Sequence, residues 1–118
     1  MDIFIVEDDS SIKKIYEKFL KLRGYNIVDT ASNGQEAVDK FKAFQKKPEI
    51  ILMDHRMPIK SGIEATKQIF EISNTSHIIF ISADRSVKEE ALSLGVTSFL
   101  EKPISLSDLI NFLKTLEN

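Results

Sequence analysis

The 118-residue chain contains no cysteine, so disulfide bonds and thiolate chemistry are excluded. That absence is compatible with a reducing compartment. The chain also lacks a strong excess of charge of either sign, because its formal net charge is −2. A balance this close to neutral gives no general reason to expect direct binding to nucleic acid.

Long hydrophobic runs are also missing. The run at residues 3–6 has no charged segment before it and is too short for a signal peptide or a membrane span. No linker, low-complexity tract or internal repeat divides the chain. We therefore expect a cytoplasmic protein without membrane contact. We also expect a single domain over residues 1–118, with no output domain, because the chain stops directly after its last predicted helix.

Short apolar runs alternate with helical patterns along the whole chain. Runs rich in Ile, Val and Phe predict strands at residues 3–6, 25–28, 50–53, 77–81 and 98–100. Apolar residues at helical spacing predict helices over residues 10–23, 34–46, 62–73, 86–94 and 106–117. The expected N-caps are Asp9 or Ser10, Asn33, Ser61, Ser86 and Ser105, with Gly24 and Gly95 just beyond helix ends.

This alternation predicts an α/β fold of the (βα)₅ type. Continuously apolar strands indicate a parallel sheet covered by helices on both faces, which is a three-layer sandwich. Right-handed crossovers and five strands favour the doubly wound, flavodoxin-like order 2-1-3-4-5.

Polar side chains follow four of the predicted strands at their carboxyl ends. Glu7 and Asp8 follow the first strand, Asp54 the third, Ser82 the fourth and Lys102 the fifth. In a doubly wound sheet, ligands bind beyond these ends, next to the switch point between strands 1 and 3. We therefore expect these five side chains to meet at one edge of the sheet.

Three carboxylates so close together repel one another, and a hard divalent cation removes the conflict. Few protein oxygens and an open mouth favour Mg²⁺, which retains water and shares phosphate oxygens. Lys102 adds a second positive charge beside Asp54. Asp54 can then act as a nucleophile toward phosphorus and form an aspartyl phosphate, with Lys102 and Ser82 stabilising the phosphoryl oxygens.

Four motifs occur in order at these strand ends: "ED" at 7–8, "MDHRMP" at 53–58, "ISA" at 81–83 and "FLEKP" at 99–103. With them the chain resembles, over essentially its whole length, the response-regulator receiver domains of two-component signalling. The resemblance implies that Asp54 is the phosphoacceptor and that Asp54, Asp8 and, through water, Glu7 hold Mg²⁺. The backbone carbonyl of Arg56 would complete the metal site, and Lys102 would pair with the phosphoryl group.

The resemblance also implies a switch pair and a cis peptide bond before Pro103. The hydroxyl of Ser82 would move toward the phosphoryl group, and the Phe99 ring would turn inward to fill the space left. Two residues depart from the usual pattern, namely Glu7, where Asp is common, and Arg56, where a small or amide side chain is common. We expect Arg56 to lie over the mouth of the site, paired with Asp84, and to modulate the access of water.

The resemblance implies a stand-alone receiver that takes its phosphoryl group from a sensor histidine kinase and then binds a downstream effector protein. Such a protein catalyses only the phosphorylation and dephosphorylation of its own Asp54 and is not a turnover enzyme. Kinase docking near the first helix would use Ser11, Ile15 and Ile104. His55 and His77 lack partners at metal-ligand spacing and are expected to be structural or exposed.

Two alternatives remain open on the sequence. One is a phosphorelay intermediate that passes the group to a histidine phosphotransfer domain. The other is a binding module that works without phosphorylation, which the intact acidic cluster disfavours. A phosphatase of the aspartyl-phosphate type is also disfavoured, because Arg56 stands where its second acid would be.

Overall fold

The sheet at the centre of the computed structural model has five parallel strands in the order β2-β1-β3-β4-β5, which confirms the predicted topology. The structure describes residues 1–117, and Asn118, the last residue of the predicted domain, lies outside them. The strands are β1 (Asp2–Val6), β2 (Asn26–Ala31), β3 (Ile50–Met53), β4 (His77–Ser82) and β5 (Ser98–Glu101). The helices are α1 (Ser10–Leu22), α2 (Gly34–Ala43), α3 (Gly62–Ile72), α4 (Lys88–Leu94) and α5 (Leu106–Thr115), with a 3₁₀ turn, η1 (Arg85–Val87), before α4.

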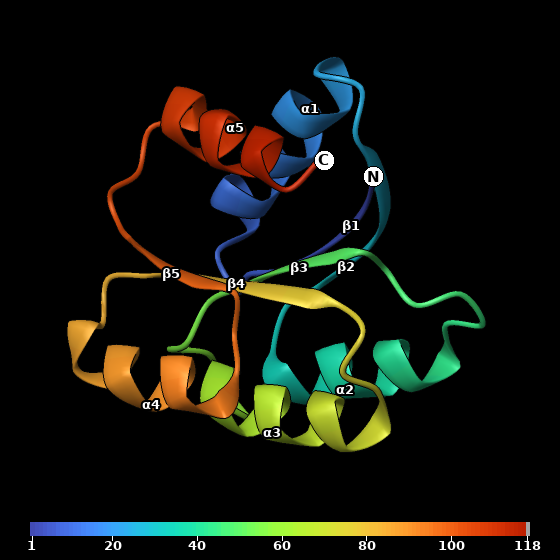
Figure 1. The fold of residues 1–118 in the computed structure, drawn as a ribbon, viewed down its shortest axis with the longest axis vertical. Coiled ribbons are helices and arrows are strands. Elements are labelled where there is room, and N and C mark those ends of the chain that lie inside the picture. The colour runs from blue at the N-terminus through green and yellow to red at the C-terminus, as the bar shows by residue number, and fades with distance from the viewer. Residues whose placement is uncertain (118) are drawn as a thin grey trace.

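Helices cover both faces of the sheet. Helices α1 and α5 lie on one face, and α2, α3 and α4 lie on the other (Figure 1). Successive side chains of a strand point to opposite faces. Accordingly, Phe4 packs in the core beneath α2, α3 and α4, whereas Ile3 and Ile5 pack in the core beneath α1 and α5. The two cores explain why the central strands are apolar at every position.

Most helices begin where the sequence predicts, because a side-chain oxygen accepts from the free amides of the first turn. Asp9, Asn33, Ser61 and Ser105 cap α1, α2, α3 and α5. The predicted Ser86 cap is wrong. Asp84 accepts from the Ser86 amide and starts η1, and α4 follows without a side-chain cap.

Two elements, β2 and α2, end three residues away from the predicted position. Strand β2 continues to Ala31, because its pairing with β1 runs on to Val6 and Ala31. Lys40 also donates to the Asp29 carboxylate at 3.0 Å and to the Thr30 carbonyl at 2.6 Å. Helix α2 stops at Ala43 rather than residue 46. The Lys47 ammonium donates to the carbonyls of Phe41 and Phe44, which satisfies the acceptors at this helix end.

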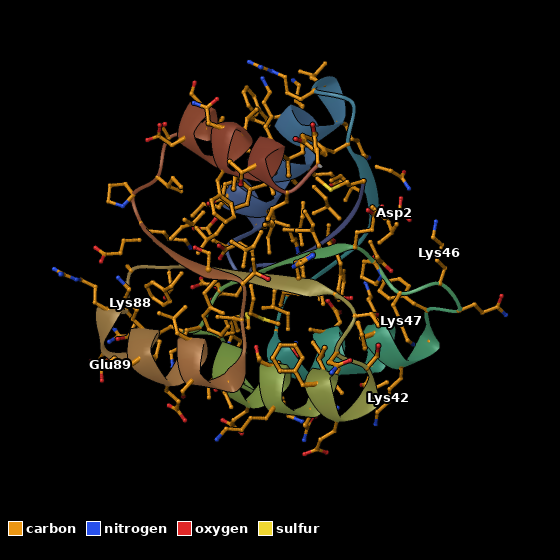
Figure 2. The ribbon with its side chains drawn as sticks, viewed as in Figure 1. Asp2, Lys42, Lys46, Lys47, Lys88 and Glu89 are labelled. Atoms are coloured by element: carbon orange, nitrogen blue, oxygen red, sulfur yellow. The ribbon has the colours of Figure 1, made fainter. Side chains whose placement is uncertain are left out.

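Charged side chains lie on the outside of the helical layers. Lys42 on α2 and Lys88 and Glu89 in the first turn of α4 are exposed, and Lys42 and Glu89 lie on the outer side of their helices (Figure 2). Lys46, in the loop after α2, lies 3.8 Å from the Asp2 carboxylate (Figure 2). Among residues 1–117, no helix has the length and apolar character needed to cross a membrane.

The loop between β3 and α3 contains a strained residue. Ile59 has φ +73°, and the Lys60 amide donates to the Pro58 carbonyl at 2.8 Å across it, which is the hydrogen bond of a classic γ-turn. A β-branched residue is disfavoured in this region of φ, and the Ile59 side chain is 80% exposed, so it gains little by packing.

Replacing Ile59 with Asn is therefore expected to raise the free energy of unfolding by about 1 kcal/mol, since Asn tolerates positive φ. Urea denaturation followed by circular dichroism measures the change. The exposed Leu92 lies in α4 with ordinary helical geometry, so Leu92→Asn is the matched control and should not stabilise. Equal or lower stability of Ile59→Asn would show that the turn is unstrained.

Candidate functional site

The acidic residues meet because β1 and β3 are neighbours in register. Val6 pairs with Met53, so Glu7 and Asp54 are the next residues on adjacent strands. The Asp54 amide donates to the Val6 carbonyl at 3.1 Å and continues the ladder by one step. Carboxylate oxygens of Glu7, Asp8 and Asp54 all lie within 4.8 Å of one another. The predicted convergence of these three side chains is thus present in the fold.

Lys102 reaches this cluster from the end of β5. Its ammonium donates to Glu7 Oε1 at 2.7 Å and to Asp54 Oδ2 at 3.1 Å. Glu7 is 3% exposed and Asp54 is 9% exposed, so the ion pairs are shielded from water. The peptide bond between Lys102 and Pro103 is cis, as the resemblance implied.

Burial and charge act in opposite directions on these groups. Burial raises the pKa of Glu7 above its ordinary value, although the hydrogen bonds from Lys102 and from the Asp9 amide lower it. Burial lowers the pKa of Lys102, but its contacts with Glu7 and Asp54 outweigh burial and leave the pKa raised. The ammonium is therefore held charged between two carboxylates that would otherwise repel each other.

A second group of polar residues stands beside Asp54. A cavity of about 280 Å³ is lined by Asp54, Arg56, Ser82, Ala83, Asp84, Arg85 and Lys102. Arg56 Nε donates to Asp84 Oδ2 at 3.1 Å, so the predicted pairing across the mouth is present. Hydrogen bonds from Ser86 and then Arg56 lower the pKa of Asp84 to about 2.

The two residues of the expected switch lie on β4 and β5. Ser82 is buried, and its hydroxyl accepts from the Asp84 amide at 3.1 Å. Phe99 is also buried, and its ring stacks on Phe80 with 6.1 Å between the ring centres. In this structure the ring already points inward while the Ser82 hydroxyl is held by its own loop.

Two residues at the site, Gly62 and His55, had no functional role in the predictions made from the sequence. The Gly62 amide donates to the His55 carbonyl at 2.9 Å, and a Cβ at Gly62 would stand 2.1 Å from the Asp54 carbonyl oxygen. A glycine directly after the N-cap Ser61 was the available signal, since close backbone approach requires glycine. His55 carried no signal of its own. His77 is exposed and pairs with Thr97 Oγ1 at 2.9 Å, far along β4 from the site.

The donor set fits Mg²⁺. Three carboxylates supply hard oxygen ligands, and Asp8 is exposed, so the ligand set opens toward solvent. Mg²⁺ keeps several waters and needs few protein oxygens, which suits an open cluster of this kind. The Arg56 backbone follows Asp54 by two residues, as the resemblance requires.

An apolar groove extends from Lys102 along α1. It has a volume of about 410 Å³ and is lined by Ile12, Ile15, Tyr16, Ala83, Lys102, Pro103, Ile104 and Leu106. Ile15 is 52% exposed, so a large apolar side chain is open to solvent along this groove. Ile15 and Ile104, two of the three predicted docking residues, line this groove, whereas Ser11 does not.

Comparison with known proteins agrees with this geometry. The family model described as "response regulator receiver domain" matches residues 3–114. The chain is 34% identical over 113 residues to the chemotaxis protein CheY of Thermotoga maritima, which covers 94% of this chain and 92% of that protein. It is 36% identical over 115 residues to two-component response regulator 24 of Arabidopsis thaliana, which covers 95% of this chain and 81% of that protein.

A solved structure supports the same assignment. A chain in the crystal structure of the CheX–CheY–BeF3–Mg²⁺ complex from Borrelia burgdorferi superposes with a TM-score of 0.91 at 28% identity, covering 98% of this chain and 88% of that chain. The family model, the relatives and the solved structure thus point to one family. The chain belongs to the response regulator receiver domain family.

Proposed function

We propose that this receiver domain accepts a phosphoryl group on Asp54 from the phosphohistidine of a sensor kinase. An oxygen of Asp54 forms a bond to phosphorus while the bond from phosphorus to the imidazole nitrogen breaks, and the imidazole leaves after taking a proton. The observation that carries the proposal is the cluster of Glu7, Asp8 and Asp54 within 4.8 Å, beside the Lys102 ammonium.

The chain's own residues supply part of the charge stabilisation. Lys102 already contacts Asp54, so its ammonium can stabilise the negative charge that develops on the phosphoryl oxygens. The Ser82 hydroxyl lines the same cavity, and because it accepts from the Asp84 amide, its own hydrogen is left to donate to a phosphoryl oxygen. Glu7, Asp8, Asp54 and the Arg56 carbonyl would hold Mg²⁺, which supplies further positive charge beside the phosphoryl group when bound. The neighbouring structure that contains Mg²⁺ and BeF3 favours this assignment.

The apolar groove beside α1 suits the docking of a kinase, because it opens next to Lys102 and Asp54. We propose that this encounter takes place in the cytoplasm. Binding in the groove through Ile15 and Ile104 would bring a phosphohistidine to the site. Movement of Ser82 and Phe99 would then alter β4, β5 and the adjacent helices, and so change the affinity for a downstream effector protein. The chain would act only on its own Asp54 and would not turn over other substrates.

Intact-mass measurement tests the proposal. The parent incubated with phosphoramidate and MgCl₂ should gain one labile phosphoryl group, and Asp54→Ala should gain none. If the variant gains the same mass, another residue is the phosphoacceptor. If the parent gains none, the phosphorylation-independent binding module is favoured. Transfer from the phosphorylated parent to a histidine phosphotransfer domain would instead identify a phosphorelay intermediate.

Arg56 gives a further prediction. Its guanidinium is tied to Asp84 across the mouth of the cavity, where it obstructs water on its way to the aspartyl phosphate. Arg56→Asn should therefore dephosphorylate several-fold faster than the parent, as followed by loss of the phosphorylated mass over time. Arg23→Asn removes a remote arginine that lies over Phe19 and serves as the control. A dephosphorylation rate for Arg56→Asn equal to the parent's would show that Arg56 does not limit the access of water.

A further inference from the structure

Helix α3 begins directly against the phosphoacceptor. The first amides of a helix have no partner within the helix and need acceptors from elsewhere. In α3 the Gly62 amide donates to the His55 carbonyl at 2.9 Å, and the Ile63 amide donates to His55 Nδ1 at 3.4 Å. The Glu64 amide donates to Ser61 Oγ at 3.2 Å. His55 therefore supplies two of the three acceptors at this helix start, and the N-cap residue supplies the third.

The backbone amide of His55 also makes a hydrogen bond to the Asp54 side chain. The His55 amide donates to Asp54 Oδ1 at 2.7 Å, on the opposite carboxylate oxygen from the one that Lys102 contacts. The two oxygens of Asp54 are thus held by one partner each, the backbone of His55 and the ammonium of Lys102. Any rotation of the His55 backbone would move the donor that orients Asp54 Oδ1.

We infer that the His55 imidazole is a positioning residue for the phosphorylation of Asp54. Its Nδ1 accepts from the Ile63 amide, which locks the residue to α3, and its own amide then holds the Asp54 carboxylate in a fixed orientation. Since the Ile63 amide donates to it, Nδ1 is the acceptor nitrogen of the ring. The inference rests on the proposed function, because the reaction that His55 supports is the phosphorylation of Asp54.

The start of α3 and the backbone of His55 are packed too closely for another group to replace Nδ1 as the acceptor of the Ile63 amide. A Cβ at Gly62 would stand 2.9 Å from the His55 Cα and 2.1 Å from the Asp54 carbonyl oxygen, so the helix start is in direct contact with this backbone. His55 is partly buried, which limits the water available to replace its Nδ1 as an acceptor. Loss of the ring acceptor would leave the Ile63 amide without its partner at a crowded helix start.

Two substitutions separate the acceptor from the bulk of the side chain. His55→Leu removes the acceptor and should slow phosphorylation by phosphoramidate about tenfold, because small misplacement of a reacting group is costly. His55→Asn places a carbonyl oxygen near the position of Nδ1 and should keep the rate within about threefold of the parent's. The same change at the other histidine, His77→Leu, is the matched control and should leave the rate unaltered.

Nuclear magnetic resonance supplies a readout that does not depend on phosphorylation. In the His77→Leu background a single histidine remains, and its ring ¹⁵N shifts should show an unprotonated Nδ1. The Ile63 amide should exchange faster in His55→Leu than in His55→Asn, and the ¹³C shift of the Asp54 carboxyl should move only in His55→Leu.

The outcomes distinguish this inference from the proposed function. If the parent gains no phosphoryl group, the proposed function fails, and the ring tautomer, the Ile63 amide and the Asp54 shift decide the positioning role. If the parent is phosphorylated but His55→Leu reacts at the parent's rate, or His55→Asn is as slow as His55→Leu, the inference is overturned. A proton found on Nδ1 overturns it as well.

Discussion

Replacing Lys102 with alanine is expected to lower the free energy of unfolding by about 3 kcal/mol in metal-free buffer at neutral pH. The ammonium lies 2.7 Å from Glu7 and 3.1 Å from Asp54, and both carboxylates are almost fully buried. Without it, two buried negative charges face each other with no cation between them. Urea denaturation followed by circular dichroism measures the loss.

An exposed ion pair provides the matched control. Lys21 lies 3.1 Å from Glu17 on α1, but these side chains are 56% and 38% exposed. Because water screens such a pair, Lys21→Ala should cost less than about 0.5 kcal/mol. A loss in Lys102→Ala no greater than in Lys21→Ala would mean that Lys102 does not neutralise the acidic cluster.

Two further measurements test the physical cause. Adding MgCl₂ should stabilise Lys102→Ala more than the parent, because the metal restores the missing positive charge.

The effect of pH on the stability of Lys102→Ala follows from the pKa of Glu7. Removal of Lys102 takes away contributions that lower the pKa of Glu7, so the pKa rises further above its ordinary value of 4.5. A raised carboxyl pKa stabilises the fold at low pH and loses that effect as the pH rises, so the gap between variant and parent should widen once the pH passes the raised pKa of Glu7 in the parent.

A double substitution completes the test. Glu7→Gln removes one buried charge while keeping a hydrogen-bond acceptor for Lys102. Combined with Lys102→Ala, it should recover part of the lost stability, since Asp54 then faces a neutral amide. A double variant as unstable as the sum of the two single changes would place the cause of the loss outside the acidic cluster.

The sequence was sufficient to predict the topology and the composition of the site. Strands that are apolar at every position require a sheet covered on both faces, and a sheet of that kind brings residues after strand ends together. Glu7, Asp54 and Lys102 meet for this reason alone, without any need for loop geometry.

Features that depend on tertiary contacts could not be predicted in the same way. The end of β2 is polar and gave no strand signal, because its pairing with β1 decides its length. Ser86 has the chemistry of an N-cap, yet Asp84 takes that place, since it also pairs with Arg56 from another loop. His55 acts through two amides of a helix that begins seven residues later, a contact that no local pattern encodes.

Gly62→Ala is expected to disrupt stability and phosphorylation together. The added Cβ would stand 2.1 Å from the Asp54 carbonyl oxygen and 3.0 Å from the carbonyl carbon, and a backbone atom cannot swing aside as a side chain can. Either α3 moves away from β3, or the backbone of Asp54 is displaced. The free energy of unfolding should fall by about 3 kcal/mol. The phosphorylation rate with phosphoramidate should fall about 100-fold, because a reacting group displaced by about 1 Å loses its alignment.

Two other glycines separate these effects. Gly24 has φ +91°, and no atom of residues 1–117 lies within 4 Å of an added Cβ, so Gly24→Ala should cost only about 1 kcal/mol through strain and leave phosphorylation unchanged. At Gly34 an added Cβ would meet the Lys60 carbonyl oxygen at 2.3 Å, a backbone clash of similar severity in the same loop but not at Asp54 itself. Gly34→Ala should therefore lose stability much as Gly62→Ala does while retaining more of the phosphorylation rate. If Gly62→Ala is destabilised yet phosphorylated at the parent's rate, the start of α3 does not hold the phosphoacceptor in place, and the orientation of Asp54 must come from β3 and Lys102 alone.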